Sequence, residues 1–350
     1  MADHKDSYSK YLVIYFITLA IASLPLIFNY LFLKQSGEFL SPQQIYSQQN
    51  ANAQDAVIYG SAIFDNFDNV KFYAYAQKKP KVIAFGSSRV LAFRKAFFTQ
   101  SFYNLGYMAP SIQDGLKSAP KILEAHKPEI VLLGIDFWWF NQVSRSINYE
   151  QNNYSSKENI IDPAHLLKPF TWIKEGKISF KEYAKITLHN DKVKHLGVKG
   201  KTRASGLADD GSMYYTDQVT LQNTTLKDPG FVSFKNGIKT GIAPFNYGAL
   251  ASEIHLKKFL ELINLFESHG IKVLLFFPPL APDINEFMKN YNYAYIDDFM
   301  AAKDLSLAPY VNLEYLEEKS NKHFGLAMIP NEKITTKPEL DFLCLKCHKY

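Results

Sequence analysis

The chain has 350 residues, which allows one large domain with an insertion or two small ones, since a typical domain has roughly 100–200 residues. Hydrophobic residues make up 47% and charged residues 21%, the balance of a folded globular protein rather than a disordered one. The formal net charge of +5 is spread along the chain without a dense basic block, which argues against nucleic acid as a partner. The aromatic share of 15% is high and indicates a thick core or an apolar cleft.

The N-terminal segment predicts a single membrane crossing. Residues 11–33 carry no charge, and a helix of roughly 20 apolar residues crosses a bilayer. Lys5 and Lys10 precede this run, so the positive-inside tendency leaves the short tail in the cytoplasm and places the rest of the chain outside. A buried soluble helix is the weaker alternative, because such a helix seldom lacks a polar face. A cleaved signal peptide is the stronger one, because residues 20–22 (Ala-Ile-Ala) resemble a cleavage site, although the apolar run continues beyond them.

Beyond the anchor, short apolar runs alternate with helical patterns. Residues 34–56 are rich in Gln, Ser and Asn and are interpreted as a linker. Buried parallel strands are predicted at residues 81–85, 102–106, 130–135 and 271–277. Helices are predicted at residues 90–98, 112–126 and 253–269, the last with Gly270 as its C-terminal cap. This alternation is typical of βαβ units and a parallel sheet, and residues 141–245 are interpreted as an insertion or lid on that sheet.

Three of the predicted strands end in residues that could carry chemistry. They are residues 86–89 (Gly-Ser-Ser-Arg), 104–106 (Asn-Leu-Gly) and 134–136 (Gly-Ile-Asp). In an open parallel sheet, ligands bind beyond the carboxyl ends of the strands. Ser88 follows a strand and precedes a helical pattern, where a tight turn can present its hydroxyl as a nucleophile beside backbone N–H donors. The alternative is that Ser87 or Ser88 only caps the helix.

The order and placement of these blocks resemble the SGNH (GDSL-type) hydrolase superfamily over roughly residues 57–298. The resemblance is greatest to its membrane-anchored branch, which includes D-alanyl-lipoteichoic acid transfer proteins and polysaccharide O-acyl-modifying proteins. In that branch too, Gly-Ser-Ser replaces Gly-Asp-Ser. The resemblance implies a three-layer, flavodoxin-like parallel sheet preceded by one transmembrane helix.

The resemblance also implies roles for individual residues. Ser88 would be the nucleophile and the Gly106 N–H an oxyanion donor. At the place of the family's oxyanion asparagine this chain has Asp136, and an ionised carboxylate cannot donate a hydrogen bond. Asp136 is therefore expected either to be protonated or to have another role, such as pairing with Arg89. Asn104 is expected to line the same site.

The catalytic base is the weakest match. The family supplies it from an Asp-x-x-His block near the end of the chain, and no such block follows the fourth strand here. His323 lies in the expected region, but Ser320 stands where the aspartate should be. The one Asp-x-x-His block, Asp162 to His165, lies in the insertion and is the alternative base pair. A chain without a base would be a degenerate, non-catalytic scaffold of an envelope polysaccharide assembly.

The two cysteines lie near the carboxyl end, in Cys344-Leu345-Lys346-Cys347-His348. The pattern is that of c-type haem attachment, but no haem-enclosing domain surrounds it. A disordered tail or weak metal capture is the favoured interpretation, so we expect no cofactor and no metal site.

These inferences define one overall prediction for the chain. The predicted segments are a cytoplasmic tail (1–10), an anchor (11–33), a linker (34–56), an SGNH-like α/β domain (57–310) with its insertion (141–245), and an atypical tail (311–350). We expect an acyl-ester hydrolase or O-acyltransferase that acts through a serine acyl-enzyme on an acylated envelope glycan or a lipid-linked substrate. It would sit in the bacterial inner membrane, facing the periplasm or the extracellular side. The expected partners are the membrane, that substrate and envelope-assembly proteins, but no nucleic acid.

Overall fold

The computed structural model describes residues 3–51, 56–64, 66–140, 162–188, 194–214 and 252–276. The chain divides into two compact units. Unit 1 comprises Met1–Asp65 and Lys157–Gly206, and unit 2 comprises Asn66–Ser156 and Leu207–Tyr350. The predicted insertion is therefore shared between the units, and its described residues up to Gly206 fold with the N-terminal segment.

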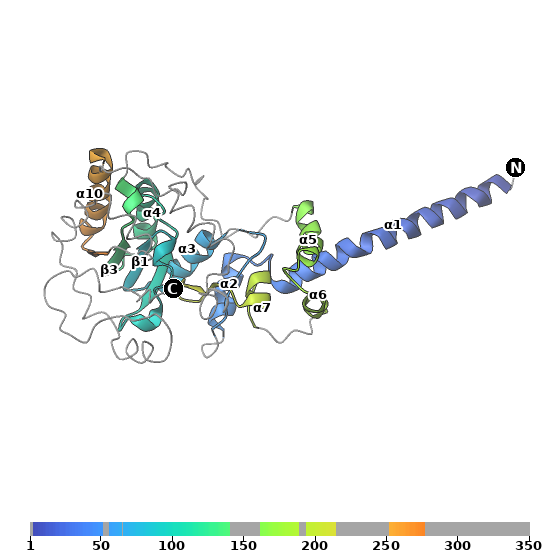
Figure 1. Cartoon of the computed structure of the whole chain (residues 1–350), viewed down its shortest axis with the longest axis horizontal. Coiled ribbons are helices and arrows are strands. Elements are labelled where there is room, and N and C mark those ends of the chain that lie inside the picture. The colour runs from blue at the N-terminus through green and yellow to red at the C-terminus, as the bar shows by residue number, and fades with distance from the viewer. Residues whose placement is uncertain are drawn as a thin grey trace, which may run out of the picture. The chain divides into compact units, whose positions relative to one another are not determined.

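Unit 1 begins with helix α1 (Asp3–Ser36), the long N-terminal helix in Figure 1. Among the described residues it is the one helix long and apolar enough to cross a membrane. Its large apolar side chains are exposed from Tyr11 to Phe28, and continuous exposure ends at Asn29, which is fully buried. The last five residues of the predicted crossing, 29–33, are thus partly covered by protein.

Four short helices of the insertion belong to the same unit as α1. They are the 3-10 helix η4 (Pro163–Leu167) and the α-helices α5 (Lys168–Lys174), α6 (Phe180–Thr187) and α7 (Val198–Arg203). Phe32 and Leu33 of α1 share a buried core with Tyr183 and Ile186 of α6 and with Val198 of α7. This core joins segments that are far apart in the sequence, so hydrophobic periodicity could not reveal it.

The residues predicted as a linker contain a helix, α2 (Pro42–Asn50). Ser41 and Gln44 form a capping box at its start: the Ser41 hydroxyl accepts from the Gln44 N–H at 3.3 Å, and Gln44 Oε1 accepts from the Ser41 N–H at 2.8 Å. Ile45 and Gln49 are buried. Polar composition suggested a linker because the helix buries only a few of its side chains.

Unit 2 contains a four-stranded sheet in the order β2-β1-β3-β6, with every neighbouring pair parallel. The strands are β1 (Val82–Gly86), β2 (Phe102–Gly106), β3 (Ile130–Gly134) and β6 (Lys272–Phe276). Each lies within a residue or so of its predicted range, so the mixed α/β class with a parallel sheet is confirmed. Two further strands of two residues each, β4 (Gly206–Leu207) and β5 (Met213–Tyr214), pair with each other.

The two faces of the sheet are covered differently. One face packs under helices, with Phe85 of β1 in edge-to-face contact with Phe266 of α10 at 5.8 Å. These helices are α4 (Ile112–Ala125) and α10 (Glu253–Glu267), which pack against each other, and both match their predictions closely. Helix α3 (Phe67–Lys78) contacts β2 and α4.

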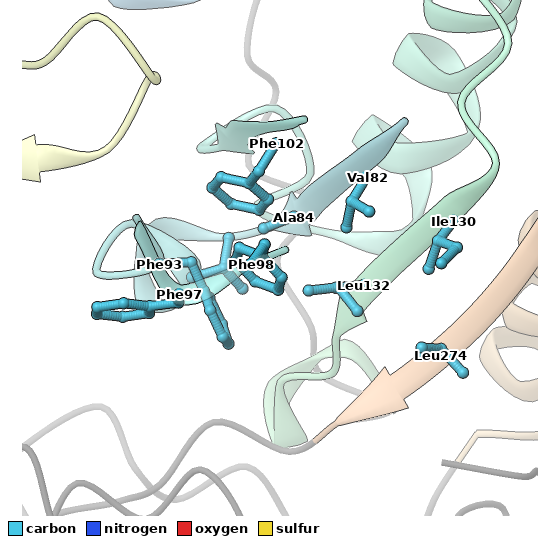
Figure 2. Close-up of a cluster of buried hydrophobic side chains, with 10 residues drawn as sticks. Val82, Ala84, Phe93, Phe97, Phe98, Phe102, Ile130, Leu132 and Leu274 are labelled. Atoms are coloured by element: carbon cyan, nitrogen blue, oxygen red, sulfur yellow. The ribbon is translucent and has the colours of Figure 1, made fainter. Parts of the chain in front are cut away.

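The opposite face carries a phenylalanine-rich core. Val82, Ala84 and Leu132 from the strands cluster there with Phe93 and Phe98 from the β1–β2 connection (Figure 2). The Phe98 ring stacks on the Phe102 ring with centroids 4.2 Å apart.

The helix predicted at residues 90–98 is wrong. This connection forms two 3-10 turns of three residues, η1 (Ser88–Val90) and η2 (Lys95–Phe97), separated by an extended Arg94. The reason lies in Asn104 of β2, whose amide donates to the Val90 and Phe93 carbonyl oxygens at 2.8 and 3.0 Å. The Val90 and Phe93 carbonyl oxygens therefore accept from a side chain rather than from the backbone N–H groups of an α-helix. The phenylalanines of the connection pack onto the sheet.

Candidate functional site

The strand order reverses at β1. The chain leaves β1 for β2 on one side and then returns past β1 to β3 on the other. In doubly wound sheets, ligands bind at the carboxyl ends of the two strands that flank such a reversal. Here Ser87, Ser88 and Arg89 follow β1, and Asp136 follows β3. These are residues that were predicted to carry chemistry at the carboxyl ends of the strands.

The two serines after β1 have different environments. Ser87 is only 3% exposed, and its hydroxyl accepts from the Arg89 N–H at 3.2 Å. Its carbonyl oxygen accepts from the Tyr107 N–H at 3.2 Å. The Ser88 side chain is exposed, and neither its hydroxyl nor its N–H has a hydrogen-bond partner among the described residues. Capping is therefore the role of Ser87, and Ser88 is left available.

Arg89 and Asp136 form a buried ion pair. Arg89 Nη1 lies 2.8 Å from Asp136 Oδ1, and the carboxylate side chain is fully buried. Of the two roles predicted for Asp136, pairing with Arg89 is present. Asp136 Oδ2 is buried without a hydrogen-bond partner within the described part of the chain. The guanidinium also lies over the Trp138 ring, 5.7 Å from its centroid.

Burial dominates the protonation equilibria of this pair. It raises the pKa of Asp136 to about 6, although the Arg89 charge and nearby Ser87 and Arg89 donors favour the ionised form. Burial likewise lowers the pKa of Arg89, against the attraction of Asp136. Asp136 therefore gains a proton in a pH range where an ordinary aspartate is ionised.

The Gly106 N–H is engaged in this structure. It donates to Asn104 Oδ1 at 2.8 Å, and the Asn104 side chain is fully buried. A Cβ atom at Gly106 would lie 2.8 Å from Val90 Cγ2, so the glycine is required for the close approach of the β1–β2 connection. Asn104, which was predicted to line the site, holds that connection in place. Gly106 could donate to an oxyanion only after Asn104 releases it.

Two further residues near the site were not identified from the sequence. Tyr107 has a left-handed backbone with φ 78° and a side chain 37% exposed. No sequence pattern marks a tyrosine for that conformation. Lys71 of α3 is fully buried, and its ammonium donates to the Gly106 carbonyl oxygen at 2.8 Å. Burial lowers its pKa to about 7, against the attraction of Asp68 and Asp210.

The two tryptophans after β3 have different environments. Trp139 is 1% exposed and packs in the core against Phe259, whereas Trp138 is partly exposed beside Arg89. Both indole N–H groups donate to the Pro110 carbonyl oxygen, at 3.2 and 3.1 Å.

The alternative base pair serves as a helix cap in unit 1. Asp162 is the N-terminal cap of η4, and its Oδ1 accepts from the Ala164 N–H at 2.8 Å. His165 Nδ1 in turn accepts from the Asp162 N–H at 3.2 Å. Local capping therefore accounts for this Asp-x-x-His pattern. His323, the other candidate base, and the two cysteines lie outside the described residues.

No family model matches the chain, and neither a curated protein nor a solved structure matches it. Ser88 and its surroundings therefore carry the functional inference. Ser88 has an exposed hydroxyl and an N–H without a partner among the described residues, and the next residue, Arg89, is paired with the buried Asp136 carboxylate. Among the described residues, no group of three or more His, Cys, Asp or Glu side chains could hold a metal ion.

Proposed function

We propose that this chain is an acyl-ester hydrolase or O-acyltransferase of SGNH type that forms an acyl-enzyme on Ser88. The observation that supports it is the division of labour after β1. Ser87 caps the turn, so the exposed Ser88 hydroxyl is not needed for local structure. A serine in this position, at a strand-order reversal, is suited to attack a bound ester.

The reaction would proceed in two steps. In the first step, a base removes the proton from Ser88 Oγ, and Oγ bonds to the carbonyl carbon of the ester. The C–O bond to the alcohol then breaks, and the base returns the proton to the departing alcohol oxygen. Water, or the hydroxyl of an acceptor, then gives its proton to the base and bonds to the acyl carbon; the bond between that carbon and Ser88 Oγ breaks, and the proton is returned to Ser88 Oγ. The Ser88 N–H is available to the oxyanion in both steps. The family resemblance assigns the base to His323.

The N-terminal helix supports the proposed substrate class. Helix α1 is long and apolar enough to cross a membrane. We propose that it holds the chain in a bacterial inner membrane, with both units on the outer side, beside acylated envelope glycans or lipid-linked acyl donors.

A second function is favoured by a specific observation. The Gly106 N–H donates to Asn104, and Asp136 is paired with Arg89. Each of the two groups at the oxyanion positions therefore already has a partner within the protein. An SGNH-like scaffold of an envelope polysaccharide assembly, without catalysis, would have this arrangement.

Covalent labelling distinguishes the two functions. The full-length protein in detergent micelles is treated with a fluorophosphonate and analysed by intact mass and peptide mapping. We expect one adduct on Ser88, no adduct on Ser88→Ala, and slower labelling of the matched variant Ser87→Ala. If wild type and Ser88→Ala are equally unreactive while an active serine esterase is labelled in parallel, the scaffold function replaces the enzyme.

A further inference from the structure

Unit 1 exposes large apolar side chains in one part of its fold. Outside α1, all of those found among its described residues lie on η4, on α5 or at the two ends of α6. They are Leu167, Phe170, Phe180 and Leu188, which are 55%, 44%, 70% and 71% exposed. Phe180 is the first residue of α6 and Leu188 is its C-terminal cap, so an exposed apolar side chain lies at each end of this helix.

These helices meet α1 at a defined level. The Asn29 amide donates to the Leu166 carbonyl oxygen at 2.6 Å, and the Tyr183 hydroxyl donates to Asn29 Oδ1 at 2.7 Å. The Tyr183 ring also packs on Phe32, with centroids 4.8 Å apart, and the Phe180 ring stacks on Tyr183 at 6.1 Å. Phe180 is therefore linked through the single ring of Tyr183 to the part of α1 that is buried.

That level matches one face of a bilayer. The exposed apolar part of α1, residues 11–28, rises about 27 Å at ~1.5 Å per residue. The hydrocarbon core of a bilayer is about 30 Å thick. A membrane crossed by this part of α1 would end next to Asn29, where η4 and α6 begin to cover the helix.

The charges of the segment suit a lipid surface. Residues 162–188 contain five lysines and three acidic residues. The lysines are Lys168, Lys174, Lys177, Lys181 and Lys185, and the acidic residues are Asp162, Glu175 and Glu182. Lys181 and Lys185 are exposed on α6, adjoining Phe180 and Leu188. Lysine places its aliphatic stem along apolar surface and its ammonium among headgroups, and basic amphipathic helices bind anionic lipids.

We propose that η4, α5 and α6 form a membrane-contacting surface that lies on the same bilayer that α1 crosses. Phe180 and Leu188 enter the boundary between headgroups and acyl chains, and Lys181 and Lys185 face anionic lipid. The proposal rests on α1 crossing the membrane, and it does not depend on any activity of Ser88. The part of unit 1 that follows α1 would then lie on the membrane surface and be attached directly to the anchor.

Site-specific labelling tests this surface. Cys344 and Cys347 are replaced by serine, and single cysteines are introduced by Phe180→Cys, by Gln48→Cys on α2 as the exposed control, and by Ile17→Cys on α1. Each full-length protein is labelled with the fluorophore NBD and reconstituted in vesicles of phosphatidylcholine and phosphatidylglycerol. Emission is measured with and without lipids that carry a quencher just below the headgroup.

We expect blue-shifted emission and loss of most of the intensity at positions 17 and 180, and water-like, unquenched emission at position 48. Removing phosphatidylglycerol should reduce the quenching at position 180 but not at position 17. Quenching at 17 with water-like emission at 180 would overturn the membrane-contacting surface and leave the anchor intact. Water-like emission at 17 would overturn both. Fluorophosphonate labelling of the same samples reports separately on Ser88.

Discussion

The Arg89–Asp136 pair is buried deeply enough for desolvation to outweigh the attraction between the two charges. If attraction dominated, the pKa of Asp136 would fall and that of Arg89 would rise. Both shift in the opposite direction. The pair is therefore a weak source of stability.

This imbalance gives stability a specific pH dependence. The folded-state pKa of Asp136 is about 6, above the ordinary value of 3.8, so between these values the folded chain binds more protons than the unfolded chain. The contribution of Asp136 to stability is thus complete below pH ~4 and is lost as pH rises through about 6. A shift of about two pKa units corresponds to about 3 kcal/mol.

We expect Asp136→Asn to remove this dependence. Urea unfolding in detergent at several pH values gives the free energy of unfolding. The wild-type value minus the Asp136→Asn value should decrease as the pH rises from 4 to 6.5. Asp162→Asn, which changes an exposed cap, is the matched control and should leave the wild-type slope intact. Parallel pH profiles for wild type and Asp136→Asn would contradict the raised pKa.

At the scale of elements, one side chain determines the conformation of the β1–β2 connection. Asn104 donates to the Val90 and Phe93 carbonyls and accepts from the Gly106 N–H. All three backbone groups lose their partner if the amide is removed. Unpaired buried polar groups cost about 1–3 kcal/mol each.

We therefore expect Asn104→Leu, which keeps the branched shape of the side chain but is larger, to lower the free energy of unfolding by about 3 kcal/mol or more, since three buried backbone groups lose their partner. Gln77→Leu, on the exposed side of α3, should change it by less than about 0.5 kcal/mol. Urea unfolding in detergent measures both. An Asn104→Leu protein as stable as Gln77→Leu would show that the connection is held by its phenylalanines alone.

The same connection shows where sequence reasoning succeeds and fails. The strands were predictable because each is a short apolar run bounded by Gly or Pro, and their parallel pairing brings Arg89 and Asp136 together. The helical spacing at residues 90–98 was misleading, because the hydrogen bonds from Asn104 come from another strand. The engagement of Gly106 was hidden for a different reason: its partner Asn104 lies two residues away on the same strand, and the bond depends on the side-chain conformation of Asn104.

On the scale of the whole molecule, α1 and the helices of the insertion belong to one unit. If α1 crosses the membrane with its amino terminus inside, the rest of unit 1 must lie outside, because Asn29 is bonded to Leu166 and Tyr183.

We expect protease added to intact spheroplasts to digest the chain beyond α1, as judged by immunoblotting against a C-terminal epitope. A periplasmic protein should be cleaved and a cytoplasmic protein protected in the same sample. Full protection of the chain, with the periplasmic control cleaved, would reverse the topology.

The discontinuous build of unit 1 has a consequence for biosynthesis. Asn29 and Tyr183 are 154 residues apart, and the first three sheet strands lie between them in the chain. At ~5–20 residues per second, the ribosome takes roughly 8–30 s to reach the tyrosine after the asparagine. Until residue 166 is made, the end of the anchor has neither its Leu166 nor its Tyr183 partner, and by then β1, β2 and β3 have all been made. The nascent chain is therefore free to begin assembling its second unit before its first can close.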